Sequence, residues 1–102
     1  MAANATTRAL RIQKALAGKS ITGLQLGEIA KAIGENSVNT LRTLQEMQKE
    51  GFITQFEHNK NYALSTACLA IATAHSLEIG QAQDRLASIN QRVTAHAHQF
   101  LS

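Results

Sequence analysis

The sequence predicts a mainly α-helical protein with one small β-hairpin, and three observations support this. Alanine, leucine and isoleucine are abundant and proline is absent, which favours helix. Between Leu24 and Leu64 the chain has the signals of a short helix, a glycine turn, a second helix and two apolar strands around a polar tip. After residue 65, apolar residues recur at alternating steps of four and three. This order predicts a winged helix-turn-helix over residues 1–64, followed by a long C-terminal amphipathic helix over residues 65–102.

Length and composition restrict the class of protein. The chain has 102 residues, enough for one domain with an appended helix. No apolar run approaches the roughly 20 residues that span a membrane, and the N-terminus lacks the apolar segment of a signal peptide. The single cysteine, Cys68, fits a reducing compartment. We therefore expect a cytoplasmic protein that has no membrane partner.

Basic residues are concentrated in the first two thirds of the chain. The formal net charge is only +3, but residues 1–64 hold eight lysines and arginines against five acids. The excess positive charge lies in the part that has the helix-turn-helix pattern, as a DNA-binding unit requires. A protein that binds DNA without sequence preference would be expected to carry more charge, because its affinity comes from neutralising phosphates.

The first helix is expected from Thr6 or Thr7 to Ala17. Either threonine is a candidate N-cap, and Gly18 is a candidate C-terminal glycine. One face of this helix gathers apolar side chains, namely Ala9, Leu10, Ile12, Ala15 and Leu16. The linker over residues 18–25 has enough apolar residues for a very short strand.

Two further helices are expected around a tight turn. The first runs over Leu26–Ile33, and Gly34 follows it where positive φ is needed. The second starts at an Asn36 or Ser37 cap and ends at Gly51. Its inward stripe, at steps of three, is Val38, Leu41, Leu44 and Met47. The opposite, exposed face then carries Ser37, Asn39, Thr40 and Thr43, with Arg42 at its margin.

The wing and the final helix follow. Phe52, Ile53 and Phe56 supply the first strand, and Tyr62 and Leu64 the returning one, around a polar tip over residues 58–61. Beyond a Ser65 cap, the final helix presents a heptad seam of Cys68, Ala72, His75, Ile79, Ala82, Leu86, Ile89, Val93, His96 and Phe100.

This seam is expected to form a dimer or to dock a protein partner. Arg85 and Arg92 flank it without facing acids, so a self-specified parallel zipper is not encoded, and Gly80 weakens its middle. The predicted dimer contacts are Leu10, Ile79, Leu86, Ile89 and Val93.

Candidate DNA contacts lie on three elements. In the third helix they are Ser37, Asn39, Thr40, Arg42 and Thr43. Asparagine can bond an adenine edge, arginine a guanine edge, and threonine can touch a thymine methyl; the alternative is an ordinary solvated helix face. Asn59 and Lys60 at the wing tip can reach phosphates, although Asn-rich tips also form turns without a ligand. Arg8 and Arg11 can hold the DNA backbone or remain ordinary surface arginines.

Three segments in register resemble one family. Residues 7–12 (TRALRI) are similar to the opening helix of the IclR-type winged-helix domain, residues 26–34 (LGEIAKAIG) to its first helix of the helix-turn-helix, and residues 50–53 (EGFI) to its wing entrance. The resemblance covers residues 6 to 72 and implies a DNA-binding dimer that represses or activates transcription. The first helix and the helix after the wing contribute to dimerisation in that family. Only about 35 residues follow the wing, so we expect no effector-binding domain of the kind usual there. Leu41 and Thr43 also depart from the family's recognition helix.

Neither catalysis nor metal binding is predicted. His96 and His98, two residues apart on a helix, point to different faces, and no cysteine or carboxylate cluster completes a metal site. No phosphate-binding glycine loop and no nucleophile motif is present. We therefore expect a protein that is not an enzyme and takes no metal or cofactor.

The sequence as a whole favours a sequence-specific transcriptional regulator. Such a protein would bind double-stranded DNA as a homodimer on a roughly palindromic operator. Two alternatives come from other classes. One is a winged-helix protein-interaction adaptor or antirepressor, which would use its C-terminal helix to dock a partner. The other is a non-specific architectural DNA binder.

Overall fold

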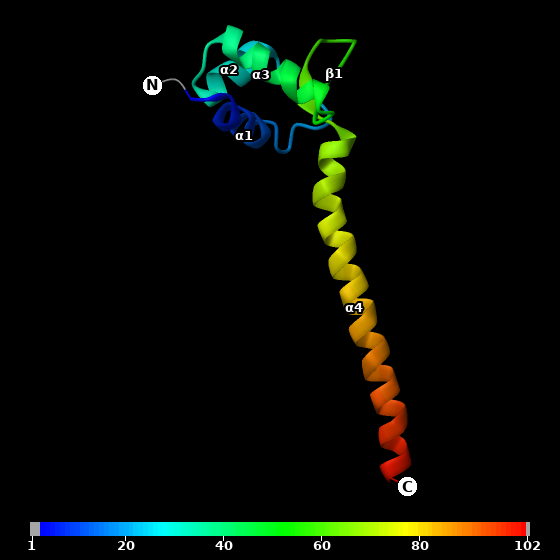
Figure 1. The fold of residues 1–102 in the computed structure, drawn as a ribbon. Helices are drawn as coiled ribbons and strands as arrows, with labels where there is room; N and C mark the ends of the chain where they lie inside the picture. Colours follow the sequence, from blue (N-terminus) through cyan, green and yellow to red (C-terminus); the bar gives the residue numbers. More distant parts are fainter. Residues whose placement is uncertain (1–2, 102) are drawn as a thin grey trace. The chain divides into compact units, whose positions relative to one another are not determined.

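The computed structural model of the chain describes residues 3–101 and confirms the predicted fold class. In chain order the elements are α1 (Ala5–Ala15), α2 (Leu26–Ile33), α3 (Ser37–Lys49), β1 (Ile53–Gln55), β2 (Tyr62–Leu64) and α4 (Thr66–Leu101) (Figure 1). The chain divides into two compact units, one up to Leu69 and one from Ala70 onward. The first unit is the winged helix-turn-helix, and the second is the remainder of α4. Within the described residues, no helix combines the length and apolar character that a membrane span requires.

Helix α1 begins one or two residues earlier than expected. Asn4, and neither threonine, is the N-cap: its Oδ1 accepts a hydrogen bond from the Thr7 backbone N–H at 2.8 Å. Asparagine is among the best N-cap residues because its short side chain satisfies an otherwise unpaired N–H of the first turn. The helix also ends earlier, at Ala15, and Gly18 lies beyond the Leu16 cap with a φ of +76°.

The turn between α2 and α3 has the expected form. Gly34 adopts a φ of +70° directly after α2, a conformation that costs glycine little. Asn36 then caps α3, because its Oδ1 accepts from the Asn39 backbone N–H at 2.8 Å. The bounds of α2 are those predicted from the sequence.

The wing is a two-stranded antiparallel sheet, and the linker before α2 forms an isolated bridge with it. Ile53 pairs with Leu64, and Gln55 pairs with Tyr62. Leu24 bridges to Tyr62 through two backbone hydrogen bonds of 2.9 and 2.8 Å. The short strand expected in the linker is therefore reduced to a single bridge, which fixes residues 18–25 against the wing.

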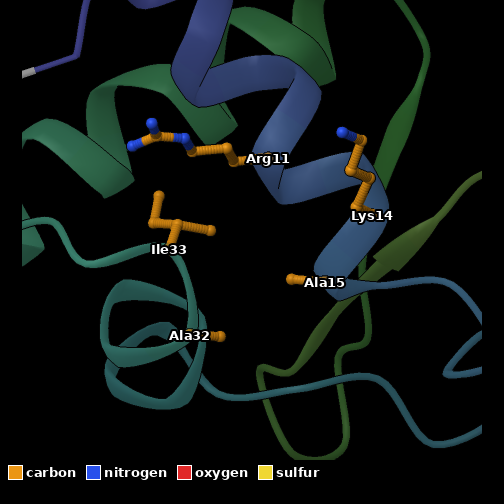
Figure 2. A pocket seen from close by; sticks show the side chains of 5 residues that line it. All are labelled: Arg11, Lys14, Ala15, Ala32 and Ile33. Atoms are coloured by element: carbon orange, nitrogen blue, oxygen red, sulfur yellow. The ribbon is translucent and has the colours of Figure 1, made fainter.

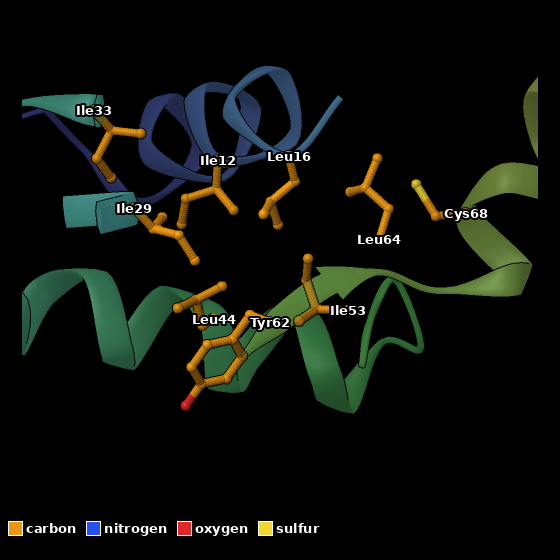
Figure 3. Packing of buried hydrophobic residues seen from close by; sticks show 9 residues of the cluster. All are labelled: Ile12, Leu16, Ile29, Ile33, Leu44, Ile53, Tyr62, Leu64 and Cys68. Atoms are coloured by element: carbon orange, nitrogen blue, oxygen red, sulfur yellow. The ribbon is translucent and has the colours of Figure 1, made fainter. Parts of the chain in front are cut away.

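One hydrophobic core holds the first unit together. It comprises Ile12, Leu16, Ile29, Ile33, Leu44, Ile53, Tyr62, Leu64 and Cys68 (Figure 3). These residues come from all three short helices, both strands and the first turn of α4. Cys68 therefore belongs to this core and is not available to the predicted seam of the last helix. Gln13 Nε2 lies 3.9 Å from its sulfur.

The predicted inward stripe of α3 is confirmed in part: Leu44 is buried and Leu41 and Met47 pack against the core, but the two threonines are buried as well and Val38 is not. Thr40 and Thr43 are 0% and 4% exposed, whereas Val38 is 65% exposed. Burial is tolerated because each threonine hydroxyl donates to a backbone carbonyl one turn earlier, Thr40 to Asn36 at 2.8 Å and Thr43 to Asn39 at 2.9 Å. A threonine bonded in this way can present its methyl group to the core.

The second unit is a single helix whose apolar side chains are uncovered within the chain. Ser65 caps α4 by accepting from the Cys68 backbone N–H at 3.2 Å, and the helix passes through Gly80 without a break. From Ala70 to Leu101 no described residue is buried. The large exposed side chains in this span are Ile71, Leu77, Ile79, Leu86, Ile89, Val93, Phe100 and Leu101.

Candidate nucleic-acid interface

The outward face of α3 is centred on Arg42. Because Thr40, Thr43 and Leu44 point inward, the residues about half a turn away point outward. They are all exposed and comprise Val38, Arg42, Gln45, Glu46 and Lys49. Arg42 was placed at the margin of the predicted contact face, and the structure puts it at the centre of the solvent-facing one.

The first turn of α3 is polar, and one of its side chains is already hydrogen-bonded within the fold. Ser37 is exposed. Asn39 is half-buried, and its Nδ2 donates to Glu35 Oε1 at 3.4 Å. Ser37 is therefore the freer of the two predicted contacts at this end of the helix.

Arg8 is not a free surface arginine. Its side chain is 14% exposed and lies 4.0 Å from the Glu35 carboxylate. Its Nε donates to Thr43 Oγ1 at 3.0 Å, and its guanidinium also donates to the carbonyl of Ala3. These contacts connect α1 to the inner side of α3. The structure therefore does not support the prediction that Arg8 is available to a DNA backbone.

The Glu35 carboxylate is held in its charged form by several donors. The Asn36 backbone N–H donates to Oε1 at 3.0 Å, and this bond holds the pKa of Glu35 below its usual range. Burial of the carboxylate opposes this shift and is the second-largest effect, whereas the Asn39 side chain and the positive charges of Arg8 and Arg11 lower the pKa further. The turn before α3 is thus an electrostatically organised junction between α1 and α3.

The wing tip places one lysine in a conformation that few lysines adopt. Lys60 has a φ of +63° and is exposed. Asn59 shapes the turn, since its Oδ1 accepts from the Asn61 backbone N–H at 2.9 Å. His58, which the sequence did not single out, stacks on Phe56 with ring centroids 5.6 Å apart. The tip therefore carries one free cation, Lys60, among its described residues.

A shallow depression of about 410 Å³ lies between α1 and α2. Arg11, Lys14 and Ala15 from α1 and Ala32 and Ile33 from α2 line it (Figure 2). Both cations are exposed. Arg11 is therefore available to an anion as predicted, and Lys14 joins it.

The structure removes some residues from the predicted DNA contacts and adds others. Thr40 and Thr43 are buried, and Arg8 is engaged inside the fold. Sequence reasoning missed Val38, Gln45 and Lys49 on the outward face. A helical wheel centred on the two threonines would have found them. Among residues 3–101, no group of three or more metal-ligating side chains gathers in one place.

Comparison with known proteins identifies the architecture. No protein family and no curated protein matches the sequence. The structure is similar to HmgR from Pseudomonas aeruginosa, with a TM-score of 0.61 and 25% identity over 71% of this chain and 29% of that chain. A MarR family transcriptional regulator from Silicibacter pomeroyi gives a TM-score of 0.56 at 20% identity, over 78% of this chain and 54% of that chain.

A third neighbour is matched over more of its length. MepR, a transcription regulator of the Staphylococcus aureus multidrug efflux pump MepA, gives a TM-score of 0.53 at 20% identity, over 93% of this chain and 75% of that chain. The chain spans less than two thirds of the first two structures. The second and third of these structures are described as transcription regulators.

Proposed function

We propose that this protein is a sequence-specific transcriptional regulator that inserts α3 into the major groove of double-stranded DNA. The observation that carries the proposal is the exposed face of α3, with Arg42 at its centre, directly after a helix and a tight glycine turn. In helix-turn-helix proteins the second helix of this unit reads base edges. The fold shared with two transcription regulators supports the same role.

Each exposed side chain suits one kind of contact. Arg42 has the planar fork that bonds the O6 and N7 atoms of guanine. Val38, 65% exposed at the start of α3, can pack against a thymine methyl. Ser37 and Lys60 suit phosphates, since they are exposed at the first turn of α3 and at the wing tip. Asn39, Asn59 and Arg11 remain secondary candidates, whereas Thr40, Thr43 and Arg8 leave the contact set.

The regulator would act as a dimer on a roughly palindromic operator. Its exposed apolar side chains support this, because a single α4 leaves a long apolar stripe uncovered. Leu10, which is 55% exposed on α1, and the stripe residues Ile79, Leu86, Ile89 and Val93 are the proposed contacts. A two-fold dimer presents two recognition helices to two half-sites about one helical turn or a multiple of it apart.

The assignment of this chain to the IclR-type regulators is also a proposal. The resemblance of residues 6 to 72 to IclR-type regulators lies entirely within the winged unit and the start of α4. One of the structural neighbours is a MarR family transcriptional regulator, whose structure is similar over 78% of this chain. We retain a cytoplasmic location and a division into a DNA-binding part (residues 1–64) and an assembly helix (residues 65–102) as parts of the same proposal.

Selection from a library of random-sequence duplexes tests this function. The purified protein is mixed with the library at near-physiological salt, and the retained duplexes are sequenced. Enrichment of a short inverted repeat is expected. Enrichment of a single asymmetric motif would support base reading and reject the palindrome.

Two other outcomes would replace the proposal. Retention without enrichment would favour the architectural DNA binder, whose affinity comes from phosphates alone. No retention even at lowered salt would exclude DNA binding and favour the protein-interaction adaptor. The Arg42→Ala variant is carried through the same selection as the matched control. Duplexes that it still retains are bound by surfaces other than the Arg42 face.

A further inference from the structure

The apolar stripe of α4 has a register that can be read residue by residue. From Ala72 onward, the positions that face one side of the helix at heptad spacing are Ala72, His75, Ile79, Ala82, Leu86, Ile89, Val93, His96 and Phe100. All of them are exposed. Ile79, Leu86, Val93 and Phe100 occupy one of the two core positions of the heptad. Ile89, Ala82 and the two histidines occupy the other.

Side-chain volume disfavours a parallel, in-register pairing of two such helices. In a parallel pair each core residue meets its own copy. Ala82 would face Ala82 of the partner subunit and leave space, while the next layer would hold two Leu86 side chains. Each histidine would face its own copy as well. Cores are stable when large and small side chains alternate across facing positions.

An antiparallel pairing centred near Asp84 makes the side-chain volume of these core layers more uniform. Reversing one helix makes the two kinds of core position face each other. Ala82 then meets Leu86 of the partner subunit, so a small side chain faces a large one. Ile79 meets Ile89 of the partner subunit, and the two-fold axis repeats both layers. Each histidine faces a different residue type, His75 meeting Val93 of the partner subunit.

The charges beside the stripe favour the same arrangement. Glu78, Arg85 and Arg92 occupy equivalent flanking positions, seven residues apart. In a parallel pair each of them would face an uncharged position of the other copy. In the antiparallel pair Glu78 faces Arg92 of the partner subunit, and the symmetry produces this ion pair twice. Arg85 faces Arg85 of the partner subunit at the centre, which is the one unfavourable contact.

No competing partner within the helix explains these charges. The side chains three and four residues from Glu78 and from Arg92 on α4 carry no opposite charge. Among residues 3–101, neither forms an ion pair in the structure, whose salt bridges are Arg8 with Glu35 and Lys49 with Glu46. Both side chains are exposed. Leu77 lies on the far side of the helix and is left uncovered by this pairing.

We propose that α4 pairs with α4 of a second copy of this chain as an antiparallel helical pair, held by Ile79–Ile89 and Ala82–Leu86 layers and by reciprocal Glu78–Arg92 ion pairs. This inference rests on the dimer of the proposed function but not on DNA binding. The N-terminal ends of the two α4 helices would lie at opposite ends of the pair.

Disulfide trapping tests the orientation without any DNA. The full-length Ile79→Cys and Ile89→Cys variants are oxidised separately and as an equimolar mixture. Both positions are exposed on α4, so the winged unit should fold normally. The wild-type chain, whose Cys68 is buried, is the control. A disulfide-linked dimer is expected in the mixture, with little in either variant alone. Efficient self-crosslinking of each single variant would indicate a parallel pair, and no crosslink in any sample would also overturn the proposal.

Charge exchange tests the register. Glu78→Arg and Arg92→Glu should each weaken the dimer roughly tenfold in sedimentation equilibrium, because like charges would then face each other twice. The double variant should recover most of this loss. Asp84→Arg, on the outer side of the helix, is the matched control and should change little. Equal effects of the single and double variants would overturn the proposed register. A monomeric wild-type chain would overturn the dimer. DNA binding is measured separately, on a selected duplex, so that failure of the dimer and failure of DNA binding can be told apart.

Discussion

The guanidinium of Arg8 donates from Nε to Thr43 Oγ1 over 3.0 Å and thereby connects α1 to the inner face of α3. The same side chain lies 4.0 Å from the Glu35 carboxylate in the turn that precedes α3. One arginine of the first helix therefore helps to fix both the rotation and the start of the proposed recognition helix. In the proposed function, Arg8 would therefore act on DNA binding through the orientation of α3, without contact to DNA.

The Arg8–Thr43 pair should be energetically coupled. Thr43→Val keeps the shape of the side chain and removes the hydroxyl, and Arg8→Met removes the charged donor while keeping an apolar stem. Each change should destabilise the fold by about 1–3 kcal/mol. The double variant should lose less than the sum, with a coupling of about 0.5–3 kcal/mol. Urea unfolding of the four proteins measures this, and Arg11→Met is the exposed control. Strict additivity would mean that the hydrogen bond contributes nothing to stability.

Glu35 should make the fold sensitive to acid. Its pKa is lowered in the folded state, so its contribution to stability is fully present above about pH 4.5 and is lost as the pH falls through the folded-state value. Glu35→Gln removes this contribution. We expect the unfolding free energy of the variant to fall less between pH 6 and pH 3 than that of the wild type. Glu57→Gln, an exposed change on the wing, should follow the wild-type curve. Parallel curves for Glu35→Gln and wild type would contradict the assigned role.

Gly23 should not tolerate alanine. It has a φ of +68°, and an added methyl group would lie 2.7 Å from the Tyr62 carbonyl oxygen. The strained backbone alone costs about 1–2 kcal/mol, and the contact would push the linker off the wing. Gly27→Ala on exposed α2 is the matched control, because its methyl meets nothing within 4 Å. That control should stabilise by about 0.5–1 kcal/mol. Thermal unfolding of both variants measures these effects: Gly23→Ala should lower the melting temperature and Gly27→Ala should raise it. An unchanged melting temperature for Gly23→Ala would contradict the account.

Lys60 should contribute charge and no sequence preference. Lys60→Asn removes the cation with a residue that tolerates positive φ, so the tip should keep its shape. We expect weaker binding to all duplexes and a decrease of about 1 in the slope of log affinity against log salt concentration. Anisotropy titrations at several salt concentrations measure the slope. An unchanged slope would place Lys60 outside the interface.

The sequence predicted the elements well because their signals are local. The glycine after Ile33, the Asn36 cap and the apolar residues on either side of the polar wing tip each depend on a few neighbouring residues, and the structure has all three. The bounds of α2 needed only a periodic stripe and a glycine. The start of α1 was missed because Asn4, two or three residues earlier, is a better cap than either threonine.

The face of α3 was not predictable by the same means. Two stripes compete in its sequence, one through Val38 and Leu41 and one through Thr40 and Thr43, and both include Leu44. Classing threonine as polar leaves out Thr40 and Thr43, which are buried, and keeps Val38, which is exposed. What settles the rotation is the hydroxyl bonding of each threonine to the preceding turn and the contact of Thr43 with Arg8, which is 35 residues away in sequence. A contact between such distant residues leaves no periodic signal.

The most direct test of the proposed base reading is Arg42→Lys on a selected duplex and on a scrambled duplex, titrated at the same salt concentration. Lysine keeps the charge and loses the planar fork that bonds a guanine edge. We predict a loss of about 1–3 kcal/mol on the selected duplex and little change on the scrambled one, with Arg11→Lys as the control. An unchanged ratio of the two affinities would contradict the proposal that the outward face of α3 reads DNA sequence.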